Sequence, residues 1–234
     1  TDIVELDGGV YGICARRNDG TVWCWGYNLH GQLGDGSTTN SDRPVQVSGI
    51  NNALQIAAGN ASCARLGDGT TWCWGYNGDG QVGDGTNIDR TTPVRVNNDS
   101  GFVDLQAGWF HTCARKANGT LWCWGSNGAG QLGDGTGTNR NVPTQVLNVS
   151  DATAIAVPGS HKTCAVRTGG LMWCWGHNGY GGLGDGTRIT RRAPVRVIGL
   201  GAVTHMANGA IGDGNFARTA TNETYAWGYN FGGS

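Results

Sequence analysis

Short apolar runs separated by glycine-rich turns recur along the whole chain. The dipeptide Trp-Gly marks every recurrence, and its tryptophans are Trp25, Trp74, Trp124, Trp175 and Trp227. Successive tryptophans are 49, 50, 51 and 52 residues apart, which is the sign of an internal repeat. The chain therefore divides into five units, at approximately 1–50, 51–100, 101–150, 151–201 and 202–234, and we expect residues 1–234 to form a single domain.

Each unit predicts short β-strands and no helix, because its apolar runs are short, regularly spaced and without helical periodicity. In the second unit the expected strands are 54–56, a strand that begins at Cys63, 71–74 and 94–96. Asp68-Gly69 stands between the second and third of these, where residues that tolerate positive φ favour a hairpin turn. We expect the fourth strands to begin directly after prolines, which are Pro44, Pro93, Pro143 and Pro194.

The third strand of each unit is apolar on both of its faces, as in Trp23-Cys24-Trp25. That pattern is typical of a sheet that neighbouring sheets cover on both sides. A four-stranded repeat of this length matches a propeller blade, so we predict an all-β fold, a β-propeller of about five blades. The fifth unit carries three of the four strands, which leaves its blade one strand short. Either a five-bladed ring tolerates the short blade, or the chain is part of a larger ring or assembly.

Eight cysteines form four pairs with identical spacing: Cys14 and Cys24, Cys63 and Cys73, Cys113 and Cys123, and Cys164 and Cys174. The hairpin turn lies midway between the members of each pair, which places them opposite each other on neighbouring strands at a distance that suits a disulfide. The fifth unit has Phe216 and Ala226 at these positions, so both cysteines are absent together. We predict four disulfides, each within one blade, and an extracellular, cell-surface or periplasmic location.

The composition indicates a folded protein with few charges. The 234 residues include 43 glycines and 10 tryptophans, and only 14% are charged, unlike a disordered chain. Sixteen basic and seventeen acidic side chains give a net charge of −1, which argues against a nucleic-acid partner. No stretch approaches the roughly 20 apolar residues that span a bilayer, so we expect no membrane insertion. Thr1 opens the chain without a signal segment, which indicates a mature or excised form.

No cluster of residues predicts catalysis or a cofactor. A calcium loop needs several oxygen ligands close together, whereas each Gly-Asp-Gly segment offers one aspartate, which favours a turn cap. These aspartates are Asp35, Asp84, Asp134 and Asp185. The glycine runs lack the Gly-Lys-Ser/Thr of a phosphate loop, and no unit combines a histidine with a nucleophile and an orienting acid. We therefore expect no metal, no cofactor and no enzymatic activity.

The string C-A-R-x-x-D-G-T-x-W-C-W-G-x-N-x-x-G-Q-L-G-D-G-T, followed by P-V-x-V, resembles the repeats of the regulator-of-chromosome-condensation superfamily. The resemblance covers all five units and implies a propeller. Secreted bacterial members, which include the second type of β-lactamase-inhibitor protein, share this propeller. Members of the superfamily usually have seven blades and include nucleotide exchange factors, inhibitors and binding modules, so the resemblance specifies the fold and leaves the function open.

Residues that differ between units are the candidates for function, because the repeated positions serve the scaffold. The repeated Trp-Gly tryptophans are therefore expected in the core. Two loop sets vary, one between the first and second strands and one after the Trp-Gly dipeptide; in the last unit the second set includes Tyr229 and Phe231. The predicted binding residues of the two sets are Tyr11, Tyr27, Tyr76, Trp109, Phe110, His111, His161, Lys162, His177 and Tyr180.

Aromatic residues in loops suit a protein interface and equally suit carbohydrate stacking. A lectin should repeat its contact residues in every unit, whereas a protein-binding face can use different loops. The variable loops therefore favour a non-catalytic, secreted or surface-exposed module that binds a protein, with a lectin-like carbohydrate-binding propeller as the alternative. Because the short last blade exposes a strand edge, we also expect it to contact another copy of the chain or a partner protein.

Overall fold

A computed structural model describes residues 2–9, 11–207 and 214–228 of the chain. These residues form nineteen strands in five antiparallel sheets, and the one helical segment among them is a 3₁₀ turn, η1 (Thr168–Gly170). Four sheets contain four strands each in chain order, and the fifth contains three. The prediction of an all-β propeller with five blades, the last one strand short, is confirmed.

The first blade comprises β1 (Ile3–Gly8), β2 (Gly12–Arg17), β3 (Val22–Gly26) and β4 (Ser41–Gln46). The second comprises β5 (Ala53–Ala57), β6 (Ala61–Leu66), β7 (Thr71–Gly75) and β8 (Arg90–Arg95). The third comprises β9 (Phe102–Ala107), β10 (His111–Lys116), β11 (Leu121–Gly125) and β12 (Arg140–Gln145). The fourth comprises β13 (Ala152–Ala156), β14 (Lys162–Arg167), β15 (Leu171–Gly176) and β16 (Arg191–Arg196). The fifth comprises β17 (Val203–Ala207), β18 (Asn215–Thr219) and β19 (Thr224–Trp227).

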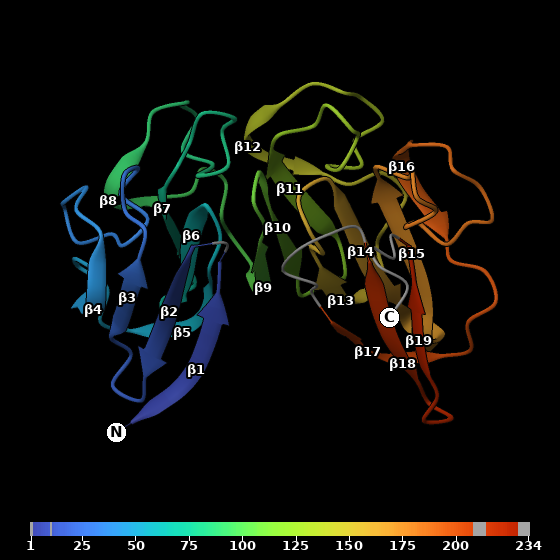
Figure 1. The fold of residues 1–234 in the computed structure, drawn as a ribbon, viewed down its shortest axis with the longest axis horizontal. Coiled ribbons are helices and arrows are strands. Elements are labelled where there is room, and N and C mark those ends of the chain that lie inside the picture. Colours follow the sequence, from blue (N-terminus) through green and yellow to red (C-terminus); the bar gives the residue numbers. More distant parts are fainter. Residues whose placement is uncertain (1, 10, 208–213, 229–234) are drawn as a thin grey trace.

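The blades follow one another in a row, from the blue first blade to the orange and red fifth blade (Figure 1). The first strands of successive blades lie against each other, β1 against β5, β5 against β9 and β9 against β13. A cluster of buried side chains joins each blade to the next, and among the described residues no such cluster joins the fifth blade to the first. The first and fifth blades therefore stand at the two ends of an open row.

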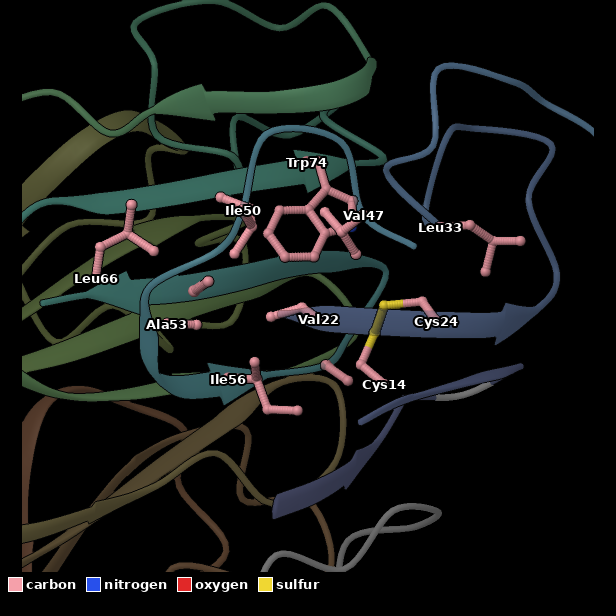
Figure 2. Packing of buried hydrophobic residues seen from close by; sticks show 12 residues of the cluster. Cys14, Val22, Cys24, Leu33, Val47, Ile50, Ala53, Ile56, Leu66 and Trp74 are labelled. Atoms are coloured by element: carbon pink, nitrogen blue, oxygen red, sulfur yellow. A yellow bond between two sulfur atoms is a disulfide. The ribbon is translucent and has the colours of Figure 1, made fainter. Parts of the chain in front are cut away.

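The core lies between neighbouring sheets. Figure 2 shows the first boundary, where Val22 and the Cys14–Cys24 disulfide of the first blade pack with Ile56 and Trp74 of the second. Three further clusters of buried side chains fill the following boundaries in the same manner. Each inner sheet is thus apolar on both faces because it meets a sheet on each side, as the third-strand pattern predicts.

The four predicted disulfides are present. Each cysteine pair is in direct register across its hairpin, and the Cα atoms lie 4.1 to 4.2 Å apart. All eight cysteines of the chain are bonded in this way. Disulfides in such number are typical of a protein from a non-reducing compartment.

The fourth strands begin earlier than the sequence predicts. β4 starts at Ser41, three residues before Pro44, and β8, β12 and β16 likewise contain their prolines. The register shifts between Cys24 and Gly26, so that Pro44 falls where the ladder is interrupted. A proline lacks the N–H that a ladder needs, and this interruption on the outermost strand accommodates it.

The repeated tryptophans join each blade to the preceding one. The indole Nε1 of Trp74 donates a hydrogen bond to the carbonyl oxygen of Gln32 at 2.9 Å, and later blades repeat this contact. The ring lies over Gly34, where an added Cβ would approach it to 2.8 Å. Core packing is confirmed for Trp74, Trp124 and Trp175, which are buried, whereas Trp227 packs against the last cluster but is half-buried. It is wrong for Trp25, which is half-buried because no described sheet lies on its outer side.

Candidate functional site

Both variable loop sets lie at the same end of the blades. Because the strands are antiparallel, the loop after the first strand and the segment after the third strand emerge together. A backbone hydrogen bond joins them in four blades, for example from Tyr27 N to Tyr11 O at 3.0 Å and from Tyr76 N to Asn60 O at 2.9 Å. The glycine of Trp-Gly makes this approach possible, since a Cβ at Gly26 would lie 2.4 Å from the Tyr11 carbonyl oxygen. The two loop sets therefore form one surface.

This surface contains a cleft of about 370 Å³ between the first three blades. The first blade contributes four of its lining residues, the second blade two and the third blade one. We call it the aromatic cleft, and its lining residues are Tyr11, Tyr27, His30, Gln32, Asn60, Tyr76 and Phe110. Four of the predicted binding residues thus come together in one place.

The rings of the cleft form a connected series. The centroids of Tyr11 and Tyr27 are 5.7 Å apart, those of Tyr27 and His30 are 6.3 Å apart, and those of His30 and Tyr76 are 4.9 Å apart. All three pairs are tilted or edge-to-face, a geometry that aromatic rings prefer. Tyr11 is 66% exposed, so this end of the series is open to a ligand.

Two carboxylates border the Tyr76 end of the cleft. Asp89 contacts Nδ1 of His30 through Oδ2 at 2.7 Å, and its Oδ1 accepts a hydrogen bond from Asn77 N at 2.7 Å. Burial raises the pKa of Tyr76 above its usual value, and the charges of Asp79 and Asp89 raise it further. Among the described residues that line the cleft, none is a lysine or an arginine. The cleft is therefore aromatic with acidic surroundings.

The other candidates at the surface lie beside the cleft or away from it; His161 and Tyr180 are exposed, and Trp109 and His177 are half-buried. Phe110 continues the aromatic surface to Trp109, 6.2 Å away between centroids, and to His161, 5.5 Å away. His177 and Tyr180 form a separate pair on the fourth blade, with centroids 6.0 Å apart. The remaining candidates of the last unit, Tyr229 and Phe231, lie outside the described residues.

Two predicted binding residues lie inside the protein, which corrects the sequence-based assignment. His111 and Lys162 are fully buried. Each stands two residues before a strand cysteine, and residues two apart on a strand share a face, which here is the face packed between blades. His111 Nε2 lies 2.8 Å from Thr163 Oγ1, and burial lowers the pKa of His111 to about 3. His111 therefore supports the boundary between the third and fourth blades, whereas Lys162 shares the face of Cys164, which packs against the fifth blade.

The sequence-based selection missed three residues of the cleft. His30 follows Tyr27 by three positions in the same variable loop, and Asn60 belongs to the other loop set. Variation between units, the signal that identified Tyr27, therefore points to both residues. Gln32 carries no such signal, because its position holds Gln in three units and belongs to the scaffold. Its Oε1 accepts a hydrogen bond from His30 N at 3.0 Å.

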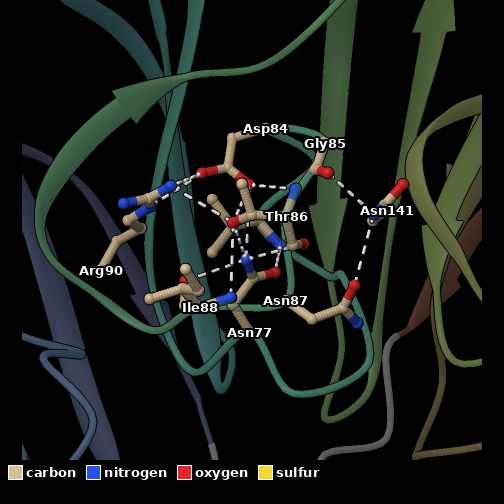
Figure 3. Close-up of polar contacts among 9 residues, drawn as sticks. Asn77, Asp84, Gly85, Thr86, Asn87, Ile88, Arg90 and Asn141 are labelled. Atoms are coloured by element: carbon tan, nitrogen blue, oxygen red, sulfur yellow. Dashed lines mark hydrogen bonds and ion pairs between the residues drawn. The ribbon is translucent and has the colours of Figure 1, made fainter.

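The Gly-Asp-Gly aspartates cap turns, as the sequence predicts. Figure 3 shows Asp84, whose Oδ1 accepts hydrogen bonds from Thr86 N and Oγ1 at 2.9 and 2.8 Å, and whose Oδ2 pairs with Arg90. Asn77 closes the same loop by donating to the carbonyl oxygens of Thr86 and Ile88. The described residues contain no group of three or more His, Cys, Asp or Glu placed to hold a metal. No helix in this part of the chain could cross a membrane.

Several solved structures share this fold. Human WBSCR16 matches with a TM-score of 0.79 and 22% identity over 88% of this chain and 56% of its own. Prp20p of Saccharomyces cerevisiae, a structure described with its binding properties to Gsp1p and histones, matches with a TM-score of 0.75 and 23% identity. The match covers 83% of this chain and 50% of Prp20p. The ectodomain of the Arabidopsis thaliana receptor kinase ACR4 matches with a TM-score of 0.59 and 20% identity, over 99% of this chain and 65% of the ectodomain chain. The chain thus spans about half of the first two structures. The expected similarity to a bacterial β-lactamase-inhibitor protein stays a prediction.

The family comparison covers most of the chain. The model of the regulator of chromosome condensation (RCC1) repeat matches residues 19–66, 68–115, 118–166 and 169–210. A second model with the same description matches residues 3–32 and 102–131. The segments of the first model begin in the hairpin turns and therefore bridge successive blades, whereas those of the second begin at the first strands β1 and β9. The chain belongs to the family of RCC1-repeat propellers.

Proposed function

We propose that the protein is a non-catalytic module that binds a protein partner through the aromatic cleft and the adjoining rings of Trp109 and His161. The observation that carries this proposal is the uneven distribution of aromatic residues on an evenly repeated scaffold. Where the second blade has Tyr76, the third has Ser126, and where the first has His30, the third has Ala129. Clustered aromatic rings at a protein surface, here half-buried apart from the exposed Tyr11 and His161, are typical of the centre of a protein interface.

Three further observations support the proposal. The structure of Prp20p, with the same fold, is described with binding to Gsp1p and histones. A lectin with one sugar site per blade would repeat its contact residues in every blade, whereas the position shared by Tyr27 and Tyr76 holds serine in the third blade and histidine in the fourth, so carbohydrate binding is the less favoured alternative. Every cysteine is bonded, which leaves no thiol nucleophile, and the disulfides support a secreted or surface-exposed protein.

The test is retention of proteins from the native surroundings on the immobilised chain, measured by quantitative mass spectrometry. We expect the double variant Tyr11→Ala/Phe110→Ala to retain about tenfold less of the partner than the unmodified chain, as loss of interface hot spots does. Tyr180→Ala is the matched control, because it removes a tyrosine outside the cleft that is 53% exposed, against 66% for Tyr11. Equal retention by the double variant, or retention of glycans with no protein on a glycan array, would contradict the proposal.

The edge of the last blade is a second proposed contact. Among the described residues, β19 pairs with β18 alone, and Thr224 to Trp227 contain no charged side chain that would discourage pairing. We propose that β19 adds to a strand of a second copy. Light scattering on the isolated chain should then give a dimer or larger species; a monodisperse monomer whose 220–228 segment is protected from hydrogen exchange would argue that the edge is covered within the chain.

A further inference from the structure

We infer that the aromatic cleft accepts one arginine side chain of the protein partner, with its guanidinium held against the tyrosine rings. This inference rests on the proposed function and names the chemistry that the cleft recognises. The cleft volume of about 370 Å³ is at the small end of ligand sites, so it suits one inserted side chain rather than a folded surface.

The ring geometry favours a planar cation. None of the ring pairs from Tyr11 to Tyr76 is stacked face to face, so no tyrosine face in the series is covered by a parallel ring. The face of a tyrosine ring is electron-rich and attracts a cation placed over it. A guanidinium is flat and weakly hydrated, and it stacks on rings more readily than the compact, strongly hydrated ammonium of lysine.

The surrounding charge favours the same ligand. The charges of Asp79 and Asp89 both act on Tyr76, Asp89 lies 2.7 Å from Nδ1 of the lining residue His30, and the lining includes no lysine or arginine to oppose a cation. Asp89 is 37% exposed and its Oδ2 has one partner, His30, among the described residues, which leaves acceptor capacity on that oxygen. An anionic side chain would meet two carboxylates and would be repelled.

Hydrogen-bond acceptors are available inside the cleft. The side chain of Asn60 lines the cleft and forms no hydrogen bond with another described residue. Its amide oxygen and the tyrosine hydroxyls offer acceptors to the N–H groups of a guanidinium, and Asp89, which contacts the lining residue His30, offers a further acceptor beside the cleft. A neutral ligand of the same shape would lose the charge-assisted part of these bonds.

The repeat itself supplies variants that preserve the fold. Asp89 caps Asn77 N, and the equivalent caps in the first and third blades are Asn40 and Asn139, both at 2.8 Å. Asp89→Asn therefore removes a charge and keeps the cap. Tyr76→Ser installs the residue that the third blade has at Ser126. Folding of both variants is verified by their thermal midpoints.

The experiment is a titration of the intact chain with acetyl-Gly-Arg-Gly-amide, followed by NMR of isotope-labelled tyrosine rings. We expect saturable shifts of Tyr11, Tyr27 and Tyr76, and binding about tenfold weaker for the citrulline peptide, a neutral isostere, and for the Tyr76→Ser variant. Asp89→Asn should weaken binding several-fold, and high salt should weaken it in the unmodified chain. Tyr180→Ala should bind as the unmodified chain does.

Equal binding of the arginine and citrulline peptides, no binding of either, or full binding by Tyr76→Ser would overturn the inference. A monosaccharide panel run on the same labelled chain provides a further outcome, since saturable tyrosine shifts with a sugar and none with the arginine peptide would assign the cleft to carbohydrate. If the Tyr11→Ala/Phe110→Ala variant loses the partner while excess arginine peptide does not displace that partner, the proposed function stands and the arginine inference falls.

Discussion

The four Gly-Asp-Gly aspartates differ in one contact. Asp84, Asp134 and Asp185 each pair with an arginine six residues later, whereas the equivalent position in the first blade is Ser41. Burial alone would raise the pKa of Asp84, but hydrogen bonds from Thr86 and Arg90 outweigh it and hold the pKa below its usual value. The six-residue spacing between aspartate and arginine is visible in the sequence. It does not predict a stabilising ion pair by itself, because an exposed pair contributes little and only the structure shows that the carboxylate is buried.

Asp84→Asn should lower the free energy of unfolding by about 1–2 kcal/mol at neutral pH, because the side chain keeps its cap and loses a charge-assisted bond. Asp35→Asn is the matched control with no arginine to lose, and we expect less than about 0.5 kcal/mol. A lowered folded-state pKa stabilises above the unfolded value, so the difference between Asp84→Asn and the unmodified chain should vanish as pH falls below that lowered pKa. Denaturant unfolding at several pH values measures it, and equal losses in the two variants would contradict the role of Arg90.

His111 should make the protein sensitive to mild acid. Its folded-state pKa of about 3 lies below the value near 6.5 of the unfolded chain, so the unfolded state binds the extra proton first. Stability should therefore decrease from about pH 6.5 downward, by up to about 1.4 kcal/mol per pH unit from this residue. We expect His111→Gln to show a shallower dependence on pH between 6.5 and 4 in denaturant titrations. Parallel curves for the two proteins would show that His111 takes up its proton in the folded state.

At the scale of elements, alternation along the strand decides what a side chain meets. The cysteines and every residue two positions away face the following blade, whereas the Trp-Gly tryptophans face the preceding one. The fifth blade supports this rule, because no described sheet follows it and Phe216, which stands in the cysteine position, is 48% exposed. The same logic explains why His111 and Lys162 are buried although they vary between units.

A fifth disulfide should form in the last blade. Phe216 and Ala226 are in direct register, as the four cysteine pairs are in theirs. The variant Phe216→Cys/Ala226→Cys should therefore oxidise and gain about 2–3 kcal/mol of stability over its reduced form, the expectation for a loop of this length. Intact mass under non-reducing conditions and denaturant unfolding with and without reductant are the measurements. Two free thiols in the oxidised preparation would mean that this hairpin does not hold the register of the other four.

Sequence reasoning succeeded for elements that repeat and failed where the environment decides. The hairpin recurs in five units and the cysteine pair in four, so the strands, the hairpins and the cysteine pairing could be predicted by comparing the copies. The start of the fourth strand was misplaced, since a proline reads as a boundary until the interrupted ladder around Pro44 is known. The cleft was half-predicted: Tyr11, Tyr27, Tyr76 and Phe110 came from variation between units, but their assembly depends on how three blades meet.

At the scale of the whole molecule, equivalent residues differ by their place in the row. Trp124 lies between two blades and is fully buried, whereas Trp25, at the outer face of the first blade, is not. Leu6 on that face is 64% exposed, and its counterparts Ile56 and Leu105 are buried. An apolar face of this kind is where a further sheet or another protein would pack.

Trp124→Ala should cost about 3–5 kcal/mol in the free energy of unfolding, as large-to-small changes in a core do. Trp25→Ala should cost much less, because its indole has no carbonyl to bind among the described residues and is already partly hydrated. Denaturant unfolding of both variants gives the comparison. Similar losses would show that the outer face of the first blade is covered in solution, and sedimentation of the unmodified chain would then identify the covering copy.

All four tryptophan contacts run in one direction, from a later blade to the carbonyl of the earlier one. The contact between neighbouring blades, which we call the joint, is therefore directional, and the two ends of the row differ chemically. Among the described residues, the first blade presents the indole of Trp25 without an acceptor. The fifth blade presents a face that has Phe216 and Ala226 in place of the cysteines. Units of this kind add head to tail, and a duplicated unit brings both halves of the joint with it. Gain or loss of a whole blade leaves every remaining joint intact. We therefore expect the number of repeats to vary more readily during evolution than the individual residues that form a joint.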